Sequence, residues 1–325
     1  MNSSIKKEFA NRIDLNMTLK DISKIVLDNY DIGNFVSNRM LYLGYGDFSF
    51  VLKTTTGKYL VKILNKETKN NECESVVDRY YHASCSSQIH CAKVYVTKDN
   101  KKLLVFEHNG VQYRLFVMQY IEGKDVYTLK YKLNPDDFEQ IAMQIAYINQ
   151  INYKPQFIYD SWAIESFNKE FKKFNHSKIA PNILLKIKKW QKLFDGVKLN
   201  SLPQSFIHGD VVDMNIVKSG KKLYIVDFSS ANYQTRISDI ATSIADLCFV
   251  ADDIKQTQSN MASFVRAYQK VQPLESYEKQ TLIIFVAMAS IIGYLNCLKN
   301  RGEYNKQLKQ KYIDNLILLE SIKTL

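Results

Sequence analysis

Two short motifs combine the side-chain types that handle magnesium and phosphate. The first is HGDVVDMN at residues 208–215, and the second is IVDF at residues 225–228. They supply three oxygen-bearing side chains, those of Asp210, Asn215 and Asp227. Mg²⁺ prefers hard oxygen ligands, and phosphoryl transfer from ATP depends mainly on positioning and on neutralising phosphate charge. The combination therefore predicts the centre of an ATP- and Mg²⁺-dependent phosphotransferase.

The three side chains suit different tasks in that chemistry. A carboxylate must receive or orient the acceptor hydroxyl, and Asp210 is the candidate. Asn215 and Asp227 are the candidates for holding Mg²⁺ against the phosphates. An isolated HGD would be equally compatible with an ordinary polar loop. The apolar run that leads directly into Asp-Phe supplies the structural context that favours the catalytic interpretation.

The segment between the two motifs is typical of a β-hairpin. Residues 216–217 and 223–226 are short apolar runs around a Ser-Gly turn that lysines flank, as in two strands joined by a tight turn. A hairpin brings its open ends together. We therefore expect Asn215 and Asp227 to face one metal site beside the loop that carries Asp210.

A glycine-containing segment at residues 43–63 precedes these motifs in the chain. Gly44 and Gly46 can bring the backbone close to phosphates. The runs at 48–53 and 59–63 predict a hairpin that turns at a Thr-Gly pair. A plain hairpin turn is the alternative interpretation, because a third glycine is absent from the loop.

The second strand of that hairpin contains Lys62, in the pattern Leu-Val-Lys-Ile. A lysine between apolar strand residues needs a partner, and ATP phosphates together with a helix glutamate would supply one. A helix is predicted at residues 71–84, from which Glu72 or Glu74 could reach Lys62. We prefer Glu74, because apolar positions follow it at three and six residues, although the choice stays open.

On these motifs the chain resembles the aminoglycoside phosphotransferase and choline kinase-like superfamily, whose members share the bilobal fold of protein kinases. The resemblance rests on HGDVVDMN and IVDF, on YLVKI at 59–63, on VMQYIEG at 117–123 and on SDIA at 238–241. It extends in order over about residues 40–300. The resemblance implies that Asp210 is the catalytic base and that His208 helps to shape its loop.

By the same resemblance, Asn215 and Asp227 would bind magnesium and Lys62 would contact ATP phosphates. Gln119 and Ile121 lie where a kinase hinge would hydrogen-bond adenine through its backbone.

The implied fold class is α+β, with a bilobal protein-kinase-like architecture. Residues 1–120 would form a small, mainly β, nucleotide-binding lobe with helical material at 17–30 and 71–84. Residues 121–325 would form a larger, mainly helical lobe that binds the acceptor. In that lobe Asp239, within SDIA, matches an aspartate that braces the catalytic loop.

Departures from eukaryotic protein kinases favour a small-molecule kinase. Gly209, Val212 and Ser229 stand where those enzymes usually carry Arg, Lys and Gly. Asn149 stands where His is common in the superfamily. The stretch at 227–249 is similar to homoserine kinase-like and hydroxylysine kinase-like members.

The composition sets further bounds. The chain has 325 residues, a formal net charge of +11 and five cysteines without a CxxC pair, as in a reduced cytoplasmic protein. Its lysines are dispersed and no nucleic-acid module is recognised, so we do not expect nucleic-acid binding. The N-terminus lacks an apolar signal segment. The uncharged run at 281–298 is interpreted as a buried core helix, and we expect no membrane association.

We therefore predict a cytoplasmic kinase that uses ATP and Mg²⁺ to phosphorylate a small hydroxylated amine, amino acid or sugar. An antibiotic kinase acting on an aminoglycoside or macrolide is the first alternative. Convergence of acidic residues in the acceptor pocket would favour it, and the candidates are Asp213, Asp246, Asp252, Asp253, Glu275 and Glu278. A catalytically silent kinase-like binding protein is the second alternative, and the presence of Lys62, Asp210, Asn215 and Asp227 disfavours it.

Overall fold

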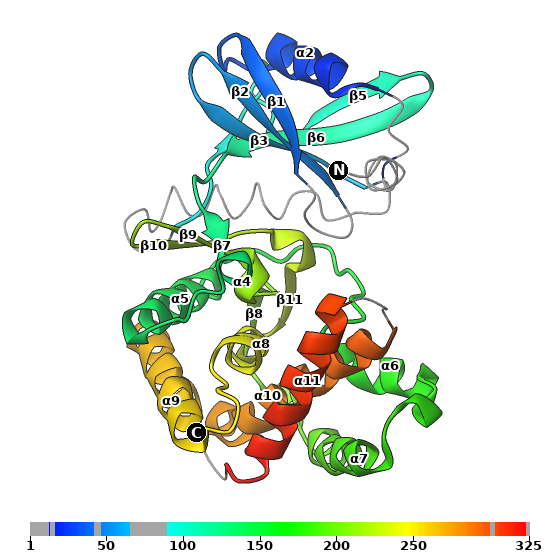
Figure 1. Ribbon diagram of the computed structural model, residues 1–325, viewed down its shortest axis with the longest axis vertical. Coiled ribbons are helices and arrows are strands. Elements are labelled where there is room, and N and C mark those ends of the chain that lie inside the picture. The colour runs from blue at the N-terminus through cyan, green and yellow to red at the C-terminus, as the bar shows by residue number, and fades with distance from the viewer. Residues whose placement is uncertain (1–12, 14–16, 42–46, 66–89, 300–302, 323–325) are drawn as a thin grey trace. The chain divides into compact units, whose positions relative to one another are not determined.

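The computed structural model describes residue 13 and residues 17–41, 47–65, 90–299 and 303–322 (Figure 1). The described residues form two compact units. The first contains those up to Glu122 apart from His90, and the second contains His90 and the residues from Gly123 onward. The helix predicted at 71–84 lies outside the described residues.

The first unit is an antiparallel sheet with one helix packed against it (Figure 1). The strands pair in the order β1-β2-β3-β6-β4, and β5 pairs with β6. The elements are α2 (Leu19–Asn29), β1 (Phe35–Leu41), β2 (Phe48–Thr54), β3 (Lys58–Ile63), β4 (Val94–Tyr95), β5 (Leu104–His108) and β6 (Val111–Gln119). The predicted hairpin is β2-β3.

Local sequence signals explain why these elements form. Thr18 and Asp21 make a capping box at the start of α2, which satisfies backbone N–H groups that a helix start leaves without partners. The buried face of α2 packs Ile22 and Val26 into the apolar core of the sheet. The core therefore fixes α2 on the face of the sheet, and the helix expected within 17–30 is confirmed.

The second unit combines short strands with a set of packed helices. Its strands are β7 (Lys124–Asp125), β8 (Gln204–Ile207), β9 (Ile216–Ser219), β10 (Lys222–Ile225) and β11 (Asn232–Thr235). Its helices are α4 (Val126–Leu129), α5 (Pro135–Ile148), α6 (Phe167–Lys173), α7 (Pro181–Asp195), α8 (Ile237–Leu247), α9 (Ile254–Val271), α10 (Ser276–Lys299) and α11 (Glu303–Leu319). Both short sheets, β10-β9-β7 and β11-β8, are antiparallel.

Helix α10 is central to the packing of this unit. It contacts α7, α8 and α11, while α5 packs against α9 (Figure 1). Among the described residues, α10 is the one helix whose length and composition would allow it to cross a membrane, and 78% of its most apolar window is buried inside the structure. The prediction of a buried core helix at 281–298 is therefore confirmed.

Helix α7 is amphipathic, and its lysines lie away from its buried face. It buries Ile183, Ile187 and Trp190 on one side, while Lys188 and Lys189 are exposed. This is the amphipathic pattern of a helix with one solvated face. Lys186 on the same helix pairs with Glu320.

Candidate active site

The loop that carries the predicted base leaves β8 and is anchored by a buried carboxylate of α8. The backbone N–H groups of His208 and Gly209 donate to the two oxygens of Asp239, at 2.8 and 2.7 Å. Asp239 is fully buried. Two charge-assisted hydrogen bonds to one carboxylate fix the course of the loop, so the predicted bracing by Asp239 is confirmed.

Asn149 completes the surroundings of Asp239. Its amide nitrogen donates to Asp239 at 3.0 Å and to the Phe206 carbonyl at 3.1 Å, and its amide oxygen accepts from the Tyr268 hydroxyl at 2.9 Å. Burial raises the pKa of Asp239 to about 6, and these hydrogen bonds oppose the increase. Asn149 therefore links α9 to the His208–Gly209 loop through Asp239, a role that the sequence left open.

The hydrogen bonds of His208 define its tautomer. Nδ1 accepts from the backbone N–H of Asp210 at 3.2 Å, while Nε2 lies 3.2 Å from the carbonyl oxygen of Val226. A carbonyl can only accept, so Nε2 carries the proton and the ring is neutral. His208 is fully buried against the ring of Phe228. It thus joins the Asp210 loop to the strand end before Asp227.

Gly209 is required by the backbone of this loop. Its φ is +84°, and a Cβ there would lie 2.6 Å from the carbonyl oxygen of Ser230. Both the left-handed conformation and the close approach demand glycine. Its presence where protein kinases usually carry Arg therefore has a steric cause in this chain.

Asp210 and Asn215 are in direct contact. The Asn215 Nδ2 atom donates to the Asp210 carboxylate at 2.8 Å and to the Asp210 carbonyl at 2.9 Å. With its nitrogen directed at Asp210, the amide oxygen of Asn215 makes no hydrogen bond to the described residues. That oxygen is therefore available to a ligand.

The predicted hairpin between Asn215 and Asp227 is confirmed. Strands β9 and β10 pair with Ile216 opposite Ile225. Beyond the strands, the N–H of Val226 donates to the Asn215 carbonyl at 2.9 Å. The hairpin thus brings its two ends together, as expected from the apolar runs and the Ser-Gly turn.

Asp227 has a backbone conformation that is uncommon for a residue with a side chain. Its φ and ψ are 71° and 73°, and its carboxylate accepts from the N–H of Ser229. Non-glycine residues in this region are typically found where function requires a particular side-chain direction. The conformation adds a second observation to the predicted metal-binding role of Asp227.

The electrostatics of the loop are strongly negative. The pKa of Asp210 is raised to about 7, first by burial and then by the charges of Asp227, Asp160 and Asp246, and the hydrogen bond from Asn215 opposes the increase. A cation beside these carboxylates would offset their repulsion.

The donor set fits magnesium. In the part of the chain that the structure describes, no three His, Cys, Asp or Glu side chains form a metal-binding group. Mg²⁺ is usually held by one or two carboxylates with phosphate and water completing its octahedron, and Asp227 with the free amide oxygen of Asn215 suits that pattern.

Two of the acidic residues singled out by the sequence do converge. The N–H of Asp213 donates to Asp246 at 2.8 Å, and Lys311 of α11 lies 2.6 Å from the other oxygen of Asp246. Glu278 pairs with Arg236 and accepts from the N–H of Glu275 at 2.8 Å. These acidic residues are therefore divided between two groups of contacts.

In the first unit, Lys62 is buried in β3 and lies 3.3 Å from Asp47. Asp47 also accepts from the N–H of Asn65 at 2.9 Å. No local sequence pattern indicates Asp47 as a partner of Lys62. The predicted partners Glu72 and Glu74, and the loop glycines Gly44 and Gly46, lie outside the described residues.

The two predicted adenine contacts lie at the end of the first unit. Gln119 is the last residue of β6, and its N–H donates to the Lys93 carbonyl at 2.7 Å. Ile121 packs beside a small apolar cluster that includes Val94 and Met118. Their contact with adenine stays a prediction.

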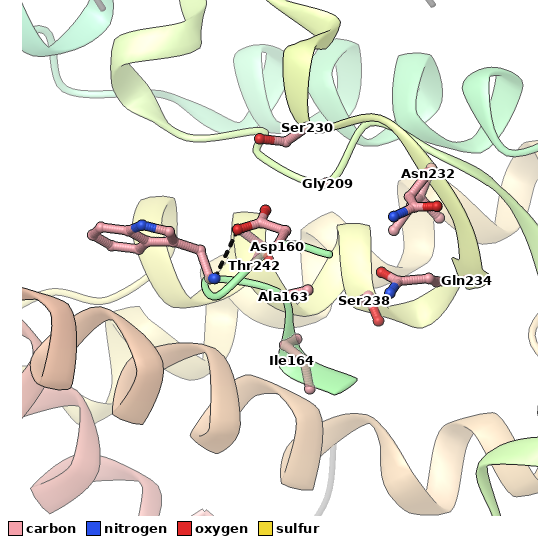
Figure 2. A pocket seen from close by; sticks show the side chains of 11 residues that line it. Asp160, Ala163, Ile164, Gly209, Ser230, Asn232, Gln234, Ser238 and Thr242 are labelled. Atoms are coloured by element: carbon pink, nitrogen blue, oxygen red, sulfur yellow. Dashed lines mark hydrogen bonds between the residues drawn. The ribbon is translucent and has the colours of Figure 1, made fainter. Parts of the chain in front are cut away.

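A small pocket opens beside Gly209 in the second unit (Figure 2). It brings residues of three segments together, which are the loop before α6, the 207–234 region and α8. The lining residues are Asp160, Trp162, Ala163, Ile164, Ile207, Gly209, Ser230, Asn232, Gln234, Ser238 and Thr242. Asp160 could not be recognised from the sequence, because a single acidic residue in a loop gives no periodic or motif signal.

The loop that carries Asp160 is attached to α6 by its neighbour Tyr159. The Tyr159 hydroxyl donates to Glu170 at 2.6 Å, and Lys299 of α10 lies 2.9 Å from the same carboxylate. Lys169 lies over the Tyr159 ring at 3.8 Å. Glu170 thus connects the pocket loop, α6 and the end of α10.

These contacts predict a pH-dependent contribution to stability. The hydrogen bonds from Tyr159 and Lys299 lower the pKa of Glu170 to about 2. A depressed pKa stabilises the fold above the unfolded value of 4.5, and the contribution is lost as pH falls towards 2. We expect Glu170→Gln to lower the free energy of unfolding at pH 7 and to cost progressively less below pH 4.5.

Urea unfolding of wild type and Glu170→Gln at pH 7, 4 and 3 would measure this difference. Glu139→Gln is the matched control, because Glu139 pairs with Lys270 at an exposed position, where ion pairs contribute little. A Glu170→Gln difference that is the same at pH 7 and pH 3 would contradict the assignment.

Comparison with known proteins identifies the class to which this fold and site belong. Residues 43–274 match the model of the phosphotransferase enzyme family. The chain therefore belongs to that family and is a phosphotransferase. The predicted resemblance to aminoglycoside phosphotransferases and choline kinases is confirmed at this level.

Among curated proteins, the chain is similar to a homoserine kinase of Rhodopseudomonas palustris, with 22% identity over 276 residues, 82% of this chain and 80% of that protein. Among solved structures it is similar to a microcompartment-associated aminopropanol kinase, with a TM-score of 0.70 and 14% identity over 93% of this chain and 96% of that one.

An amicoumacin kinase in complex with AMP-PNP and Ca²⁺ has a TM-score of 0.68 and 13% identity, over 97% of this chain and 96% of that one. These structural likenesses confirm the protein-kinase-like fold.

Proposed function

We propose that this phosphotransferase transfers the γ-phosphate of ATP to a hydroxyl group of a small hydroxylated amine, amino acid or sugar. The observation that carries the proposal is the contact between Asn215 and Asp210 at the open end of the β9-β10 hairpin, with Asp227 at the other strand end. Such a group of side chains matches the needs of phosphoryl transfer, in which positioning and charge neutralisation supply most of the rate.

Asp210 is the proposed catalytic base. The amide of Asn215 orients the Asp210 carboxylate, which would accept the proton of the acceptor hydroxyl as that oxygen attacks phosphorus. The neutral His208 and the buried Asp239 keep the loop in place. A base must lie within hydrogen-bond reach of the proton it takes, and this loop gives Asp210 a defined position.

Asn215 and Asp227 are the proposed magnesium ligands. When bound, Mg²⁺ would neutralise phosphate charge. The amide oxygen of Asn215 is free for this role because its nitrogen is directed at Asp210. The left-handed backbone conformation of Asp227 sets the direction in which its side chain leaves the backbone.

The first unit is proposed to bind the nucleotide. Lys62 would contact ATP phosphates, with its pairing to Asp47 keeping the ammonium group in place. Gly44 and Gly46 would approach the phosphates, and Gln119 and Ile121 would contact adenine. Glu74 is retained as the proposed helix partner of Lys62.

ADP release in the presence of MgATP would test the proposal against a panel of acceptors. The panel would contain amino alcohols, hydroxylated amino acids, choline, simple sugars, aminoglycosides and macrolides. We expect turnover with a small hydroxylated acceptor, and none when Mg²⁺ is chelated. Turnover with an aminoglycoside or macrolide alone would instead support the antibiotic kinase. MgATP binding without turnover across the panel would favour a silent binding protein.

A further inference from the structure

We propose that the pocket beside Gly209 binds the ammonium group of the acceptor through Asp160, and that it selects amino alcohols without a carboxylate over amino acids. The inference rests on the proposed kinase function, because it treats this pocket as the acceptor site. It differs from what similarity to homoserine kinases would suggest, since homoserine carries both an ammonium and a carboxylate group.

The position of Asp160 relative to the catalytic loop supports an acceptor role. Asp160 lines the same pocket as Gly209, the residue before Asp210 (Figure 2). A molecule held at Asp160 would therefore lie near the proposed base, as a short acceptor must.

Asp160 is an anion without a cationic partner in the described part of the chain. One of its oxygens accepts from the backbone N–H of Trp162 at 2.8 Å. No described Lys, Arg or His forms an ion pair with it, and burial raises the pKa of its carboxyl. A half-buried carboxylate without a cationic partner is stabilised most by a charged hydrogen-bond donor. A primary ammonium provides three such donors.

Gln234 gives a second and independent sign of a ligand. The residue is 7% exposed and lines the pocket (Figure 2), and its amide makes no hydrogen bond to the described residues. Its amide atoms are not among the fully buried, unpaired side-chain atoms of the described residues, so the amide is open to the pocket. An acceptor with an ammonium and a hydroxyl group would satisfy both the oxygen and the nitrogen of this amide.

The remaining lining residues extend the same chemistry. The Thr242 hydroxyl also faces the pocket without a hydrogen bond to the described residues. Together with the carboxylate of Asp160, this hydroxyl favours a small polar cation as the occupant.

The pocket lacks the group that an amino acid would need. Among the described residues that line it there is no Lys, Arg or His, although the chain carries a net charge of +11. Two cations of the surrounding elements are already engaged, since Arg236 pairs with Glu278 and Lys311 with Asp246. An acceptor carboxylate here would meet Asp160 and the negative Asp210 loop, and like charges repel.

Matched acceptors allow a direct test. Ethanolamine, 1-aminopropan-2-ol and 3-aminopropan-1-ol match serine, threonine and homoserine, respectively, with the carboxylate replaced by hydrogen. Replacing the amine of each by hydroxyl gives ethylene glycol, propane-1,2-diol and propane-1,3-diol. For the wild type we expect kcat/KM to be higher for at least one of these amino alcohols than for both its amino acid and its diol.

The variant Asp160→Asn tests the proposed contact. It keeps the size of the side chain and removes the charge, so kcat/KM for the amino alcohol should fall about 10- to 100-fold, the effect of losing one charge-assisted hydrogen bond. Turnover of the matching diol should change less than about threefold on the same reasoning. Asp195→Asn removes the same charge from the exposed end of α7 and should leave both unchanged.

Direct binding separates failure of this inference from failure of the proposed function. Ligand-observed NMR with MgAMP-PNP present would compare the same amino alcohols, amino acids and diols on wild type and Asp160→Asn. If every amino alcohol binds the wild type no better than its diol, or if Asp160→Asn leaves the preference intact, the inference is overturned. A preference for the amino acids would overturn it as well. Amine-selective binding that depends on Asp160, without any turnover, would contradict the proposed kinase function and leave the proposed ammonium contact standing.

Discussion

Replacing Asp210 with Asn is expected to lower kcat by about 10²- to 10⁴-fold for any acceptor that the wild type phosphorylates. An amide has no affinity for the proton that the acceptor hydroxyl must lose. The substitution keeps the size and shape of the side chain, and Asn215 can still donate to the new amide oxygen. The loss should therefore appear in kcat, with little change in the dissociation constant for MgATP.

Steady-state kinetics and nucleotide titration of the same preparation would measure both quantities. Asp195→Asn serves as the control for removing one negative charge at an exposed position. A kcat for Asp210→Asn within a few-fold of wild type would contradict its role as the base. A large loss of MgATP affinity would indicate that Asp210 acts mainly on the metal.

The local parts of the site could be predicted from the sequence because the residues involved are neighbours in the chain. Asn215 and Asp227 are separated by one hairpin, whose apolar strands and Ser-Gly turn are visible in the sequence. The bracing role of Asp239 came from resemblance to a family motif. In each case a short stretch with a distinctive pattern carried the information.

The contacts that could not be predicted join residues far apart in the chain. Tyr268 and Asn149 are separated by 119 positions, and Thr235 and Glu165 by 70. Each partner is an ordinary polar residue with no local pattern that names the other. Asp160 belongs to the same class, since its importance comes from the pocket that Gln234 and Gly209 complete around it.

Lys62 illustrates an intermediate case. Its position within an apolar strand correctly indicated a buried lysine that needs a partner. The sequence pattern favoured glutamates of the following helix, which lies outside the described residues, and the structure also places Asp47 at 3.3 Å. Asp47 directly precedes strand β2, the neighbour of β3, so this contact follows from the pairing of the two strands.

The largest expected change in stability concerns the ion pair between Arg236 and Glu278. Arg236 donates through Nε and Nη2 to the two carboxylate oxygens at 2.7 and 2.5 Å, and Glu278 is completely buried. Nη2 also donates to the Pro273 carbonyl, and the N–H of Glu275 donates to Glu278. The pair thus fixes the turn before α10 against the residue that precedes α8.

Arg236→Met should lower the free energy of unfolding by about 3–5 kcal/mol, because it leaves the Glu278 charge buried without compensation. Urea unfolding at pH 7 would measure the change. Lys270→Met removes a cation from the exposed pair with Glu139 and should cost no more than about 1 kcal/mol. A cost for Arg236→Met no larger than that of this control would contradict the assignment.

The double variant Arg236→Met with Glu278→Leu distinguishes the cost of an unpaired charge from the net value of the pair. Replacing both partners of a buried ion pair with apolar residues is often neutral or stabilising, so the double variant should recover most of the stability that Arg236→Met loses. Arg236 directly precedes α8, which carries Asp239. If the ion pair mainly positions α8, the double variant will regain stability but not full activity, because the bracing of the His208–Gly209 backbone depends on where α8 begins.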